Sequence, residues 1–488
     1  MGGRHDVIVL VFDTLRSDHL GCYGGDPDTP AFDAAADQGV VFESAFGVAP
    51  GTPISHASLY SGQYPSEHGV TGQYITVPED VPVMAEHFRD AGYDTFGITG
   101  PSKMGSDWGY DRGFDELFEP YYDMPEPTSP ENLTRSVVDS RFRRYFLRQL
   151  TRGGHEKTRF KFELLADRIT ADLDRPFFAL CNFATVHSPY DPPRPYKEAA
   201  TPGYSRPPLF VLEYLLDDHG SIDDPEIRLD RVLNVQTGDG IGRFLADPDY
   251  LNDREVRLLR DWYAATVEYL DDQFERFLEF YRRELMDDTI LVVTTDHGEQ
   301  LGERGLWEHS HLFHDETVKV PLIVLGPGVP EGERRSGLAS HVDVFDTLCD
   351  LCDLDAPGST SGISLFGDQR RDAVFMEYGE RDLATFERES PHGRHLDREQ
   401  LRRFCAGRKA VRTRDYRFEV TSEGDERLLE LPAQVEATDP PAGTRTRLRE
   451  RLFETLGTEF GTWPVGDPED FEIDEQVQQN LRELGYID

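Results

Sequence analysis

The chain has 488 residues, which is enough for one large α/β domain and a smaller one. Its 92 acidic residues outnumber the 51 basic ones, and the formal net charge of −41 argues against indiscriminate binding to nucleic acid. No stretch approaches 18 uninterrupted apolar residues, and no cationic, apolar leader precedes the first predicted strand. We therefore expect a cytoplasmic protein without a transmembrane segment.

The basic residues are almost all arginine. Lysine is confined to Lys103, Lys157, Lys161, Lys197, Lys319 and Lys409. Such an acidic, lysine-poor composition resembles that of proteins from salt-loving archaea, whose cytoplasm is rich in potassium chloride. At molar salt the Debye length falls to about 3 Å, which screens the self-repulsion of the chain. The composition therefore predicts a haloarchaeal type of protein that needs salt to fold.

Short apolar runs alternate with helical patterns through the first three quarters of the chain. The predicted strands are 7–12, 94–99, 177–183, 290–295 and 321–325, and the predicted helices lie near 30–38, from 52, near 81–91 and over 253–285. This alternation favours an α/β fold whose mostly parallel sheet carries helices on both faces.

The pattern changes near residue 373. Short β-type runs separated by turn residues occur at 374–378, 408–413, 416–420 and 427–431, and one or two helices are predicted within 445–488. Such runs are typical of a small antiparallel sheet. We therefore predict a catalytic domain over 1–370 and a C-terminal α+β subdomain over 371–488.

The five cysteines are scattered and odd in number, so a disulfide framework is not expected. Cys349 and Cys352 have the spacing of a zinc knuckle, but they lie within 341–352, which reads as an amphipathic helix. No second Cys or His pair follows at suitable spacing. We interpret both as core residues.

Segment 135–161 gathers nine cations inside an acidic protein. Apolar residues keep helical spacing along it, which indicates an amphipathic helix with a solvated arginine face. The alternative is a basic lip that guides an anionic substrate. The first interpretation is the simpler one, and we adopt it.

Three metal-binding side chains follow predicted strands. Asp13 comes directly after the strand at 7–12, and Asp296 and His297 come directly after the strand at 290–295. Buried parallel strands deliver side chains to a site beyond their carboxyl ends, so these residues are expected to meet there.

A hydroxyl is expected at the same site. Thr52 is predicted to be the N-cap of a helix, because Pro53 follows it and Gly62 stands where a left-handed residue would end the helix. The simplest role for Thr52 is capping alone. A helix N-terminus also favours a phosphoryl or sulfuryl group, and a cation would activate the hydroxyl. Metal ligands beside a placed hydroxyl point to ester transfer.

Histidines gather on two loops that follow predicted strands. His187 comes after the strand at 177–183, and His309, His311 and His314 cluster within six residues. We expect these side chains to bind oxygen atoms of the substrate and to pass a proton to the leaving group.

Several motifs together resemble those of the sulfatase family of the alkaline phosphatase superfamily. They are the segments 12–24, 56–65, 112–116, 262–271, 295–299, 318–323 and 408–413. The resemblance covers nearly the whole chain. It implies an alkaline-phosphatase-like core of about ten mostly parallel strands, a C-terminal subdomain with a small sheet, and one divalent metal ion.

The resemblance also implies roles for individual residues. Asp13, Asp296 and His297 match the metal ligands, and Thr52 falls on the position of the nucleophile, which also touches the metal.

The remaining matches concern the substrate. His187 matches a histidine that binds ester oxygens, and His309 or His311 lies where the family places a group near the leaving group. His56 and Lys103 fall at substrate-binding positions, although the family motif around Lys103 is reduced.

The chain departs from authentic sulfatases at the nucleophile. Those enzymes carry Cys or Ser in a Cys-x-Pro-Ser-Arg motif that is oxidised to formylglycine, whereas this chain has threonine at position 52. No formylglycine is therefore expected, and threonine nucleophiles are typical of phospho-transferring relatives. The Asp13-Thr14 and Asp296-His297 pairs supply fewer carboxylates than usual, which favours Mn²⁺ or Zn²⁺ over Ca²⁺ or Mg²⁺.

The sequence thus predicts a metal-dependent, sulfatase-like hydrolase or transferase that uses Thr52 as a covalent nucleophile on a phosphate or sulfate ester. The expected substrate is a small anionic ester of a glycan, a lipid headgroup or an aryl alcohol. Alternatives are a true sulfatase without formylglycine, a two-metal phosphodiesterase whose second site includes His187, Asp191 and His311, and a non-catalytic anion binder. The oligomeric state is open, and a homo-oligomer is one outcome.

Overall fold

The computed structural model describes residues 4–72, 76–100, 104–120, 157–171, 173, 175–205, 221–236, 239–309, 312–390 and 392–461. Lys103, His311, residues 135–156 of the basic segment and residues 462–488 lie outside these ranges.

A nine-stranded sheet forms the centre of the molecule, and strand β1 (Asp6–Phe12) lies in its middle. It pairs in parallel with β5 (Phe177–Phe183) on one side and with β8 (Thr289–Thr294) on the other. Every residue of these three strands is buried. That explains their continuous apolar sequences, because a parallel strand is covered on both faces.

The sheet extends beyond this trio in two different ways. Strands β3 (Asp94–Ile98) and β4 (Glu116–Phe118) continue it in parallel from β5. On the other side, β12 (Leu322–Leu325) runs antiparallel to β8 and to β2 (Gly39–Phe46). Strands β11 (Lys319–Val320) and β13 (Glu333–Ser340) also pair with β2. The predicted mostly parallel sheet is confirmed, with an antiparallel element added.

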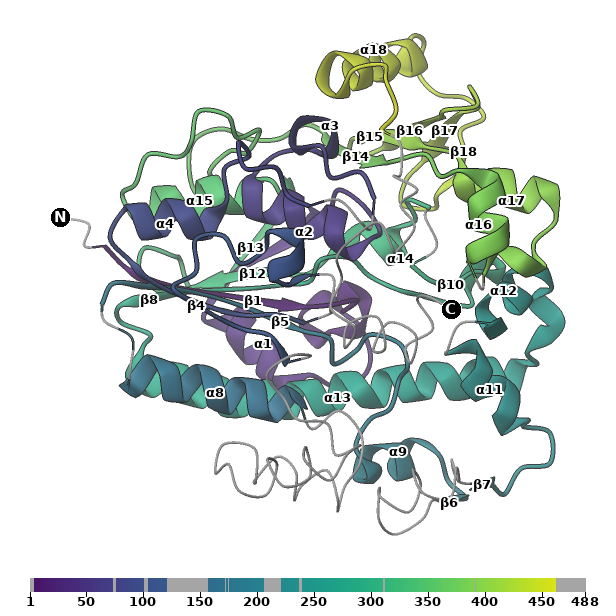
Figure 1. The fold of residues 1–488 in the computed structure, drawn as a ribbon, viewed down its shortest axis with the longest axis horizontal. Helices are drawn as coiled ribbons and strands as arrows, with labels where there is room; N and C mark the ends of the chain where they lie inside the picture. The colour runs from purple at the N-terminus through teal and green to yellow at the C-terminus, as the bar shows by residue number, and fades with distance from the viewer. Residues whose placement is uncertain are drawn as a thin grey trace.

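Helices cover both faces of the sheet (Figure 1). Helices α2 (Thr52–Ser61), α4 (Met84–Asp90) and α15 (Asp343–Leu351) lie on one face, and α1 (Pro30–Asp37), α8 (Lys157–Ala171) and α13 (Asp253–Glu284) lie on the other. Alternate residues of β1 divide between two hydrophobic clusters, with Phe12 in the cluster beneath α13 and Val11 in the cluster with α15. The two faces therefore have separate cores.

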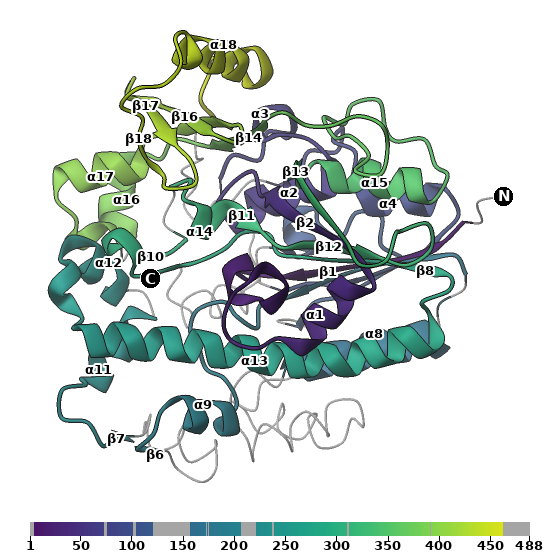
Figure 2. The ribbon, with the colours of Figure 1, turned by 180° about the vertical axis from the view of Figure 1, so that it is seen from behind.

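A five-stranded antiparallel sheet lies beside this core at one edge of the molecule (Figure 2). Its strands are β14 (Val374–Tyr378), β15 (Arg408–Arg412), β16 (Tyr416–Thr421), β17 (Glu426–Glu430) and β18 (Val435–Glu436). It is accompanied by α16 (Leu383–Glu389), α17 (Arg398–Cys405) and α18 (Thr444–Leu456). The predicted antiparallel sheet is confirmed, whereas a domain boundary at residue 370 stays a prediction.

Shorter elements complete the described part of the chain. They are α3 (Pro65–His68), α9 (Arg194–Ala200), α11 (Leu229–Val235), α12 (Asp239–Ala246), α14 (Asp315–Val318), β6 (Tyr204–Ser205), β7 (Ser221–Ile222), β9 (Gln300–Leu301) and β10 (Trp307–Glu308).

Cys349 and Cys352 are buried in the core, as predicted, and all five cysteines are free. None of the helices in the described ranges is both long enough and apolar enough to cross a membrane.

Candidate active site

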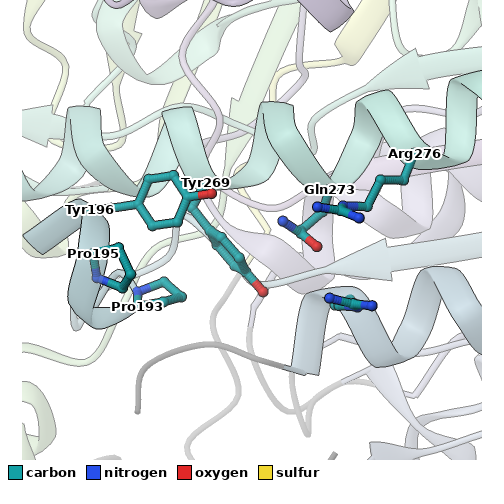
Figure 3. A pocket seen from close by; sticks show the side chains of 7 residues that line it. Pro193, Pro195, Tyr196, Tyr269, Gln273 and Arg276 are labelled. Carbon is teal, nitrogen blue, oxygen red and sulfur yellow. The ribbon is translucent and has the colours of Figure 1, made fainter. Parts of the chain in front are cut away.

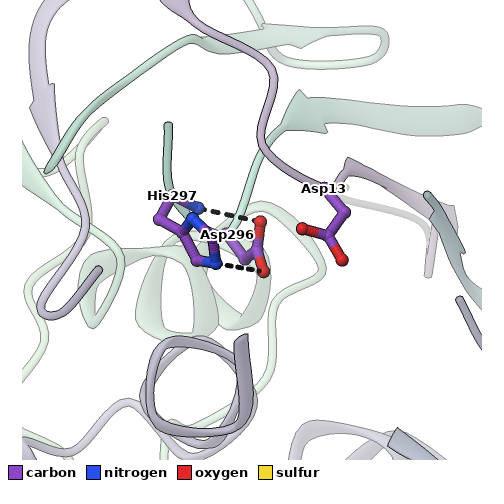
Figure 4. A group of neighbouring side chains, drawn as sticks. All are labelled: Asp13, Asp296 and His297. Carbon is purple, nitrogen blue, oxygen red and sulfur yellow. Dashed lines mark hydrogen bonds and ion pairs between the residues drawn. The ribbon is translucent and has the colours of Figure 1, made fainter. Parts of the chain in front are cut away.

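Three side chains that could hold a metal ion meet beyond the carboxyl ends of two central strands. Asp13 follows β1 directly, and Asp296 and His297 follow β8 after one intervening threonine. The ligand atoms of the three residues lie within 4.8 Å of one another, and all three side chains are buried (Figure 4). The predicted meeting of these residues is confirmed.

Three of the four carboxylate oxygens at this point lack hydrogen-bond partners among the described residues. Neither side-chain oxygen of Asp13 accepts a hydrogen bond from any described residue, and burial, followed by the charge of Asp296, raises the pKa of Asp13 well above its usual value. In Asp296, Oδ1 accepts from the amides of His297 (2.8 Å) and Thr14 (3.2 Å), while Oδ2 forms no hydrogen bond there.

The pKa of Asp296 is shifted in the opposite direction from that of Asp13. Burial on its own would raise the pKa of Asp296, but His297 and His56 and the two amides hold it at about 2. A buried carboxylate without partners is rare in a native protein. Asp13 is such a group, and it faces a second buried carboxylate with one unpaired oxygen, so the two together call for a cation. The donor set fits a divalent metal ion.

A tyrosine on α13 fixes the backbone that carries Asp13. The next residue, Thr14, has a φ of 62°, in the left-handed region that a threonine seldom adopts. The hydroxyl of Tyr263 donates to the carbonyl of Thr14 (2.8 Å) and accepts from the amide of Arg16 (2.9 Å). Tyr263 thereby closes the turn and sets the direction of the Asp13 side chain.

We predict that Tyr263→Phe weakens metal binding about 10- to 100-fold, the usual range for groups that orient metal ligands. The loss of two buried hydrogen bonds should also destabilise the fold by roughly 1–3 kcal/mol. Metal titration and urea unfolding measure the two effects separately.

The matched control is Tyr281→Phe. Tyr281 is buried on the same helix, and its hydroxyl donates to the carbonyl of Thr289 (2.8 Å), at the start of β8. This variant should lose stability and keep its metal affinity. Equal metal affinities in the two variants would contradict the role given to Tyr263.

Helix α2 brings Thr52 to the carboxylates. The prediction that Thr52 is the N-cap is wrong, because Gly51 is the N-cap and its carbonyl accepts the first helical bond, from the amide of Ser55 (3.0 Å). The Thr52 hydroxyl therefore caps no amide. The end of the helix is as predicted, since Gly62 is left-handed with a φ of 68°.

The Thr52 hydroxyl instead faces His297. Its Oγ1 lies 3.1 Å from Nε2 of His297, and the side chain is 8% exposed. Nδ1 of His297 donates to the carbonyl of Gly298 (2.9 Å), which leaves Nε2 as an acceptor in the neutral ring. The hydroxyl of Ser55 donates to the carbonyl of Asp296 (2.6 Å) and joins α2 to the loop after β8. Thr52 and the candidate metal ligands are therefore held as one unit.

His56 lies beneath the site and is fully buried. Its Nδ1 donates to the carbonyl of Thr52 (2.8 Å) and lies 3.4 Å from Oδ2 of Asp296, while Nε2 contacts the side-chain amide of Asn182. Burial lowers the pKa of His56. Both ring nitrogens thus contact protein groups, and direct substrate binding by His56 stays a prediction.

Two further predicted histidines lie together beside His297. The ring of His309 is 4.7 Å from that of His297 and 5.5 Å from that of His187, measured between centroids. Nδ1 of His309 lies 3.3 Å from Oε1 of Glu299, a fully buried carboxylate, and Nδ1 of His187 donates to the carbonyl of Ser188 (2.6 Å). His187, His297 and His309 therefore line one region, although their roles remain predictions.

His314 differs from the other histidines. It is buried, and burial together with Arg417 and other nearby arginines lowers its pKa to about 3. Arg417 belongs to the antiparallel sheet. His314 thus lies against that sheet.

A buried lysine corrects the interpretation of the basic segment. Lys161 lies on α8, and its ammonium donates to the carbonyls of Thr99 (2.8 Å) and Asn182 (2.9 Å) at the ends of β3 and β5. Burial lowers its pKa to about 7. For this residue the predicted solvated face is wrong, because the buried ammonium donates to carbonyls at the ends of two strands.

Three groups at the site were not assigned a role from the sequence. They are Glu299, Asn182 and Tyr263. Glu299 stands three residues after Asp296, which is a usable signal, and Asn182 is a polar residue at the end of a strand. Tyr263 is on a helix, 247 residues from its partner Arg16, and no local pattern marks it.

Comparisons with known proteins identify the family and the fold. The profile of the sulfatase family matches residues 5–354. The uncharacterized sulfatase YidJ of Escherichia coli (strain K12) is 24% identical over 401 residues, which cover 78% of this chain and 74% of that protein. The choline-sulfatase of Rhizobium meliloti (strain 1021) is 25% identical over 420 residues, which cover 77% and 74%.

Among solved structures, the phosphonate monoester hydrolase of Agrobacterium radiobacter has a TM-score of 0.67 and 22% identity, and the alignment covers 93% of this chain and 95% of that one. At this identity the likeness shows the fold. The predicted alkaline-phosphatase-like architecture is confirmed.

Proposed function

From the premise that the chain belongs to the sulfatase family and is an ester hydrolase, we propose that Thr52 is its covalent nucleophile and that it requires a divalent metal ion. The observation that carries this proposal is the position of the Thr52 hydroxyl, 3.1 Å from Nε2 of His297, in a site where both oxygens of Asp13 and Oδ2 of Asp296 have no hydrogen-bond partner among the described residues. The substrate is an anionic phosphate or sulfate ester.

Asp13, Asp296 and His297 would hold the ion, with Thr52 as a further contact. Two carboxylates and one imidazole suit Mn²⁺ or Zn²⁺ better than Ca²⁺ or Mg²⁺. When bound, such an ion lowers the pKa of a contacting hydroxyl and neutralises charge on the transferring group.

The side chains of the site carry out the remaining steps of the proposed reaction. The Thr52 hydroxyl releases its proton to water, its oxygen bonds to the phosphorus or sulfur atom, and the bond to the leaving oxygen breaks with its electron pair. His309, which contacts Glu299, or His311 protonates that oxygen, and His187 binds the non-bridging oxygens. Water or an acceptor alcohol then attacks the Thr52 ester, which gives hydrolysis or transfer.

We favour phosphoryl transfer over sulfuryl transfer, because threonine is not converted to formylglycine. The relatives include a choline-sulfatase and, among solved structures, a phosphonate monoester hydrolase, so both kinds of ester occur among similar proteins. A true sulfatase that uses Thr52 unmodified is the main alternative.

A two-metal site is disfavoured. Its second ion would need Asp191, but that carboxylate already accepts a hydrogen bond from Nζ of Lys197 (2.7 Å), a buried ammonium. A non-catalytic binder is disfavoured because it needs no hydroxyl beside the metal ligands.

The deciding experiment traps the intermediate. Salt-folded protein with Mn²⁺ is mixed with p-nitrophenyl phosphodiester or with an aryl sulfate, quenched in acid and analysed by peptide mass. We expect nitrophenol release and one phosphoryl group on Thr52 with the diester. Sulfate release without any adduct on Thr52 would instead indicate a true sulfatase. Absence of reaction with both substrates would count against catalysis of either ester.

We also propose that the protein is of haloarchaeal type and works in a cytoplasm rich in potassium chloride. The net charge of −41 and the scarcity of lysine support this. Raising KCl from 0.1 to 2 M should increase the thermal midpoint by at least about 5 °C, which for a chain of this size corresponds to roughly 5 kcal/mol. Circular dichroism measures the midpoint. Sucrose of equal osmolality should give a much smaller increase, and an equal increase would show that charge screening is not the cause.

A further inference from the structure

Helix α8 begins within the basic segment, and its first turn lies at the ends of two central strands. Thr158 and Lys161 are buried, and because they are three residues apart they share one face of the helix. Arg159 lies on another face, where it lines a pocket together with Tyr269 and Arg276 of α13 (Figure 3). Thr158 and Lys161 therefore face the strand ends, whereas Arg159 faces α13.

Both inward residues hold the chain that leads from β5 to His187. The hydroxyls of Thr158 and Thr185 form a hydrogen bond of 2.7 Å, and both side chains are buried. The ammonium of Lys161 donates to the carbonyl of Asn182 (2.9 Å) and to a carbonyl at the end of β3 (2.8 Å). Thr185 stands two residues before His187. Helix α8 thus holds this chain at two points shortly before the histidine.

The same stretch of chain is joined to the candidate metal site. The amide of Asp13 donates to the carbonyl of Phe183 (2.9 Å), which lies between Asn182 and Thr185. Asn182 also packs tightly against the loop after β3, since a Cβ on Gly100 would collide with its Oδ1. Residues 182–185 are therefore held between α8, β1 and the end of β3.

His187 depends on these anchors for its position. Its Nδ1 donates to the carbonyl of Ser188 (2.6 Å), a bond within the same loop that turns with the loop and does not fix the ring relative to the site. Beyond His187 the loop is fixed by Gln236, which accepts from the Ser188 hydroxyl (3.1 Å) and from the amide of Tyr190 (2.5 Å). Helix α8 supplies the anchor on the other side of the histidine.

We propose that Thr158 and Lys161 are positioning residues for His187 and thereby set the affinity of the site for the anionic group of the substrate. This inference rests on the proposed role of His187 in binding the non-bridging oxygens. Loss of either anchor lets the ring move away from those oxygens in the ground state and in the transition state alike. A uniform loss of binding raises KM and leaves kcat nearly unchanged.

The hydroxyl of Thr158 is tested by two substitutions. Thr158→Val should raise both the KM for the phosphodiester and the inhibition constant of inorganic phosphate about 3- to 30-fold, with kcat changed less than about twofold. Thr158→Ser keeps the hydroxyl and should restore both constants. The matched control is Thr170→Val, because Thr170 is exposed on the same helix and its hydroxyl donates to the carbonyl of Ala166 (2.9 Å). Equal constants in the two valine variants would overturn the proposal.

The ammonium of Lys161 is tested against a second buried lysine. Lys409 also donates to two carbonyls, those of Leu456 (2.5 Å) and Gly457 (3.2 Å), but it lies in the small antiparallel sheet. Lys161→Met should raise KM and the phosphate constant as Thr158→Val does, whereas Lys409→Met should lower only the thermal midpoint. Equal increases of KM in both methionine variants would show general destabilisation and would contradict the positioning role.

His187→Ala separates failure of this inference from failure of the proposed function. If His187→Ala binds phosphate as tightly as the wild type, the proposed role of His187 is wrong and the inference falls with it. If His187→Ala binds phosphate weakly while Thr158→Val and Lys161→Met bind it normally, only the positioning role is overturned. Hydrogen exchange reports on the loop itself, and amides of residues 184–188 should exchange about tenfold faster in Thr158→Val, the effect expected for one lost hydrogen bond. Unchanged exchange there would also overturn the proposal.

Discussion

Replacing Asp13 with asparagine is expected to abolish metal binding and turnover and, at the same time, to stabilise the metal-free protein. The carboxylate of Asp13 is fully buried, has no hydrogen-bond partner among the described residues and faces Asp296. In the absence of metal this arrangement opposes folding, and removing one charge relieves it by roughly 1–3 kcal/mol. Turnover should fall at least about 10³-fold, because the ion supplies most of the charge stabilisation.

The stability gained in Asp13→Asn depends on pH, because the pKa of Asp13 is raised in the folded protein. The pKa of Asp13 in the folded protein is raised above the ordinary value of 3.8, so its ionisation costs stability as the pH rises beyond that value. The stability advantage of Asp13→Asn should therefore be present at pH 7 and disappear below about pH 4. Urea unfolding in the presence of a chelator measures it, and metal content per chain is measured in parallel.

The control for this prediction is Asp343→Asn. Asp343 is also fully buried, but its oxygens accept from the amides of Ser340 (2.9 Å) and Ile363 (3.0 Å) and from Arg371. Loss of that charge leaves Arg371 without its partner and should cost about 3–5 kcal/mol. If both variants lose stability in the chelator, the carboxylates at the metal site are not in conflict and the metal assignment fails.

Replacing Thr52 with valine is expected to remove turnover while metal binding and folding are retained. Valine has nearly the shape of threonine, and the residue is almost fully buried, so the packing of α2 should change little. Without the hydroxyl no covalent intermediate can form, and the rate should fall by at least about 10³-fold. Thr52→Ser keeps the hydroxyl and should retain activity within about tenfold of the wild type.

The serine and valine variants of Thr52 distinguish loss of the hydroxyl group from a change in side-chain shape. Rate assays with the phosphodiester, together with metal titration, measure both properties. A valine variant as active as the wild type would exclude Thr52 as nucleophile, even if Asp13→Asn is inactive. A serine variant as inactive as the valine variant would show that the hydroxyl is not sufficient and that the site also needs the methyl group of Thr52.

The parts of the site that local patterns mark were predictable from the sequence. Asp13 and Asp296 follow apolar strands, which could be recognised in the sequence without tertiary information. Gly62 ends α2, as expected of a glycine at the end of a helix. Tyr263 and Lys161 were not predictable, because each lies on a helix and acts through a backbone group distant in sequence.

Four strands of the central sheet, β2, β4, β11 and β13, also escaped prediction. Strand β13 has the sequence ERRSGLAS, whose arginines and small residues give no β-type pattern. It is a strand because it pairs with β2. Strand β2 has an apolar start, but Glu43 and Ser44 interrupt it. Pairing partners, not intrinsic preference, decide such segments.

The position of β1 has a consequence for the order of folding. Its partners begin about 170 and 280 residues later in the chain, so the sheet cannot close around it until most of the protein has been synthesised. Closing loops of that length is slow, since the entropy is lost before the contacts form. A nascent chain that ends before β8 already contains Asp13 and Thr52 but has no place for a metal ion. Capture of the proposed metal ion is therefore a late event, which completes the native state and cannot guide the early chain toward it.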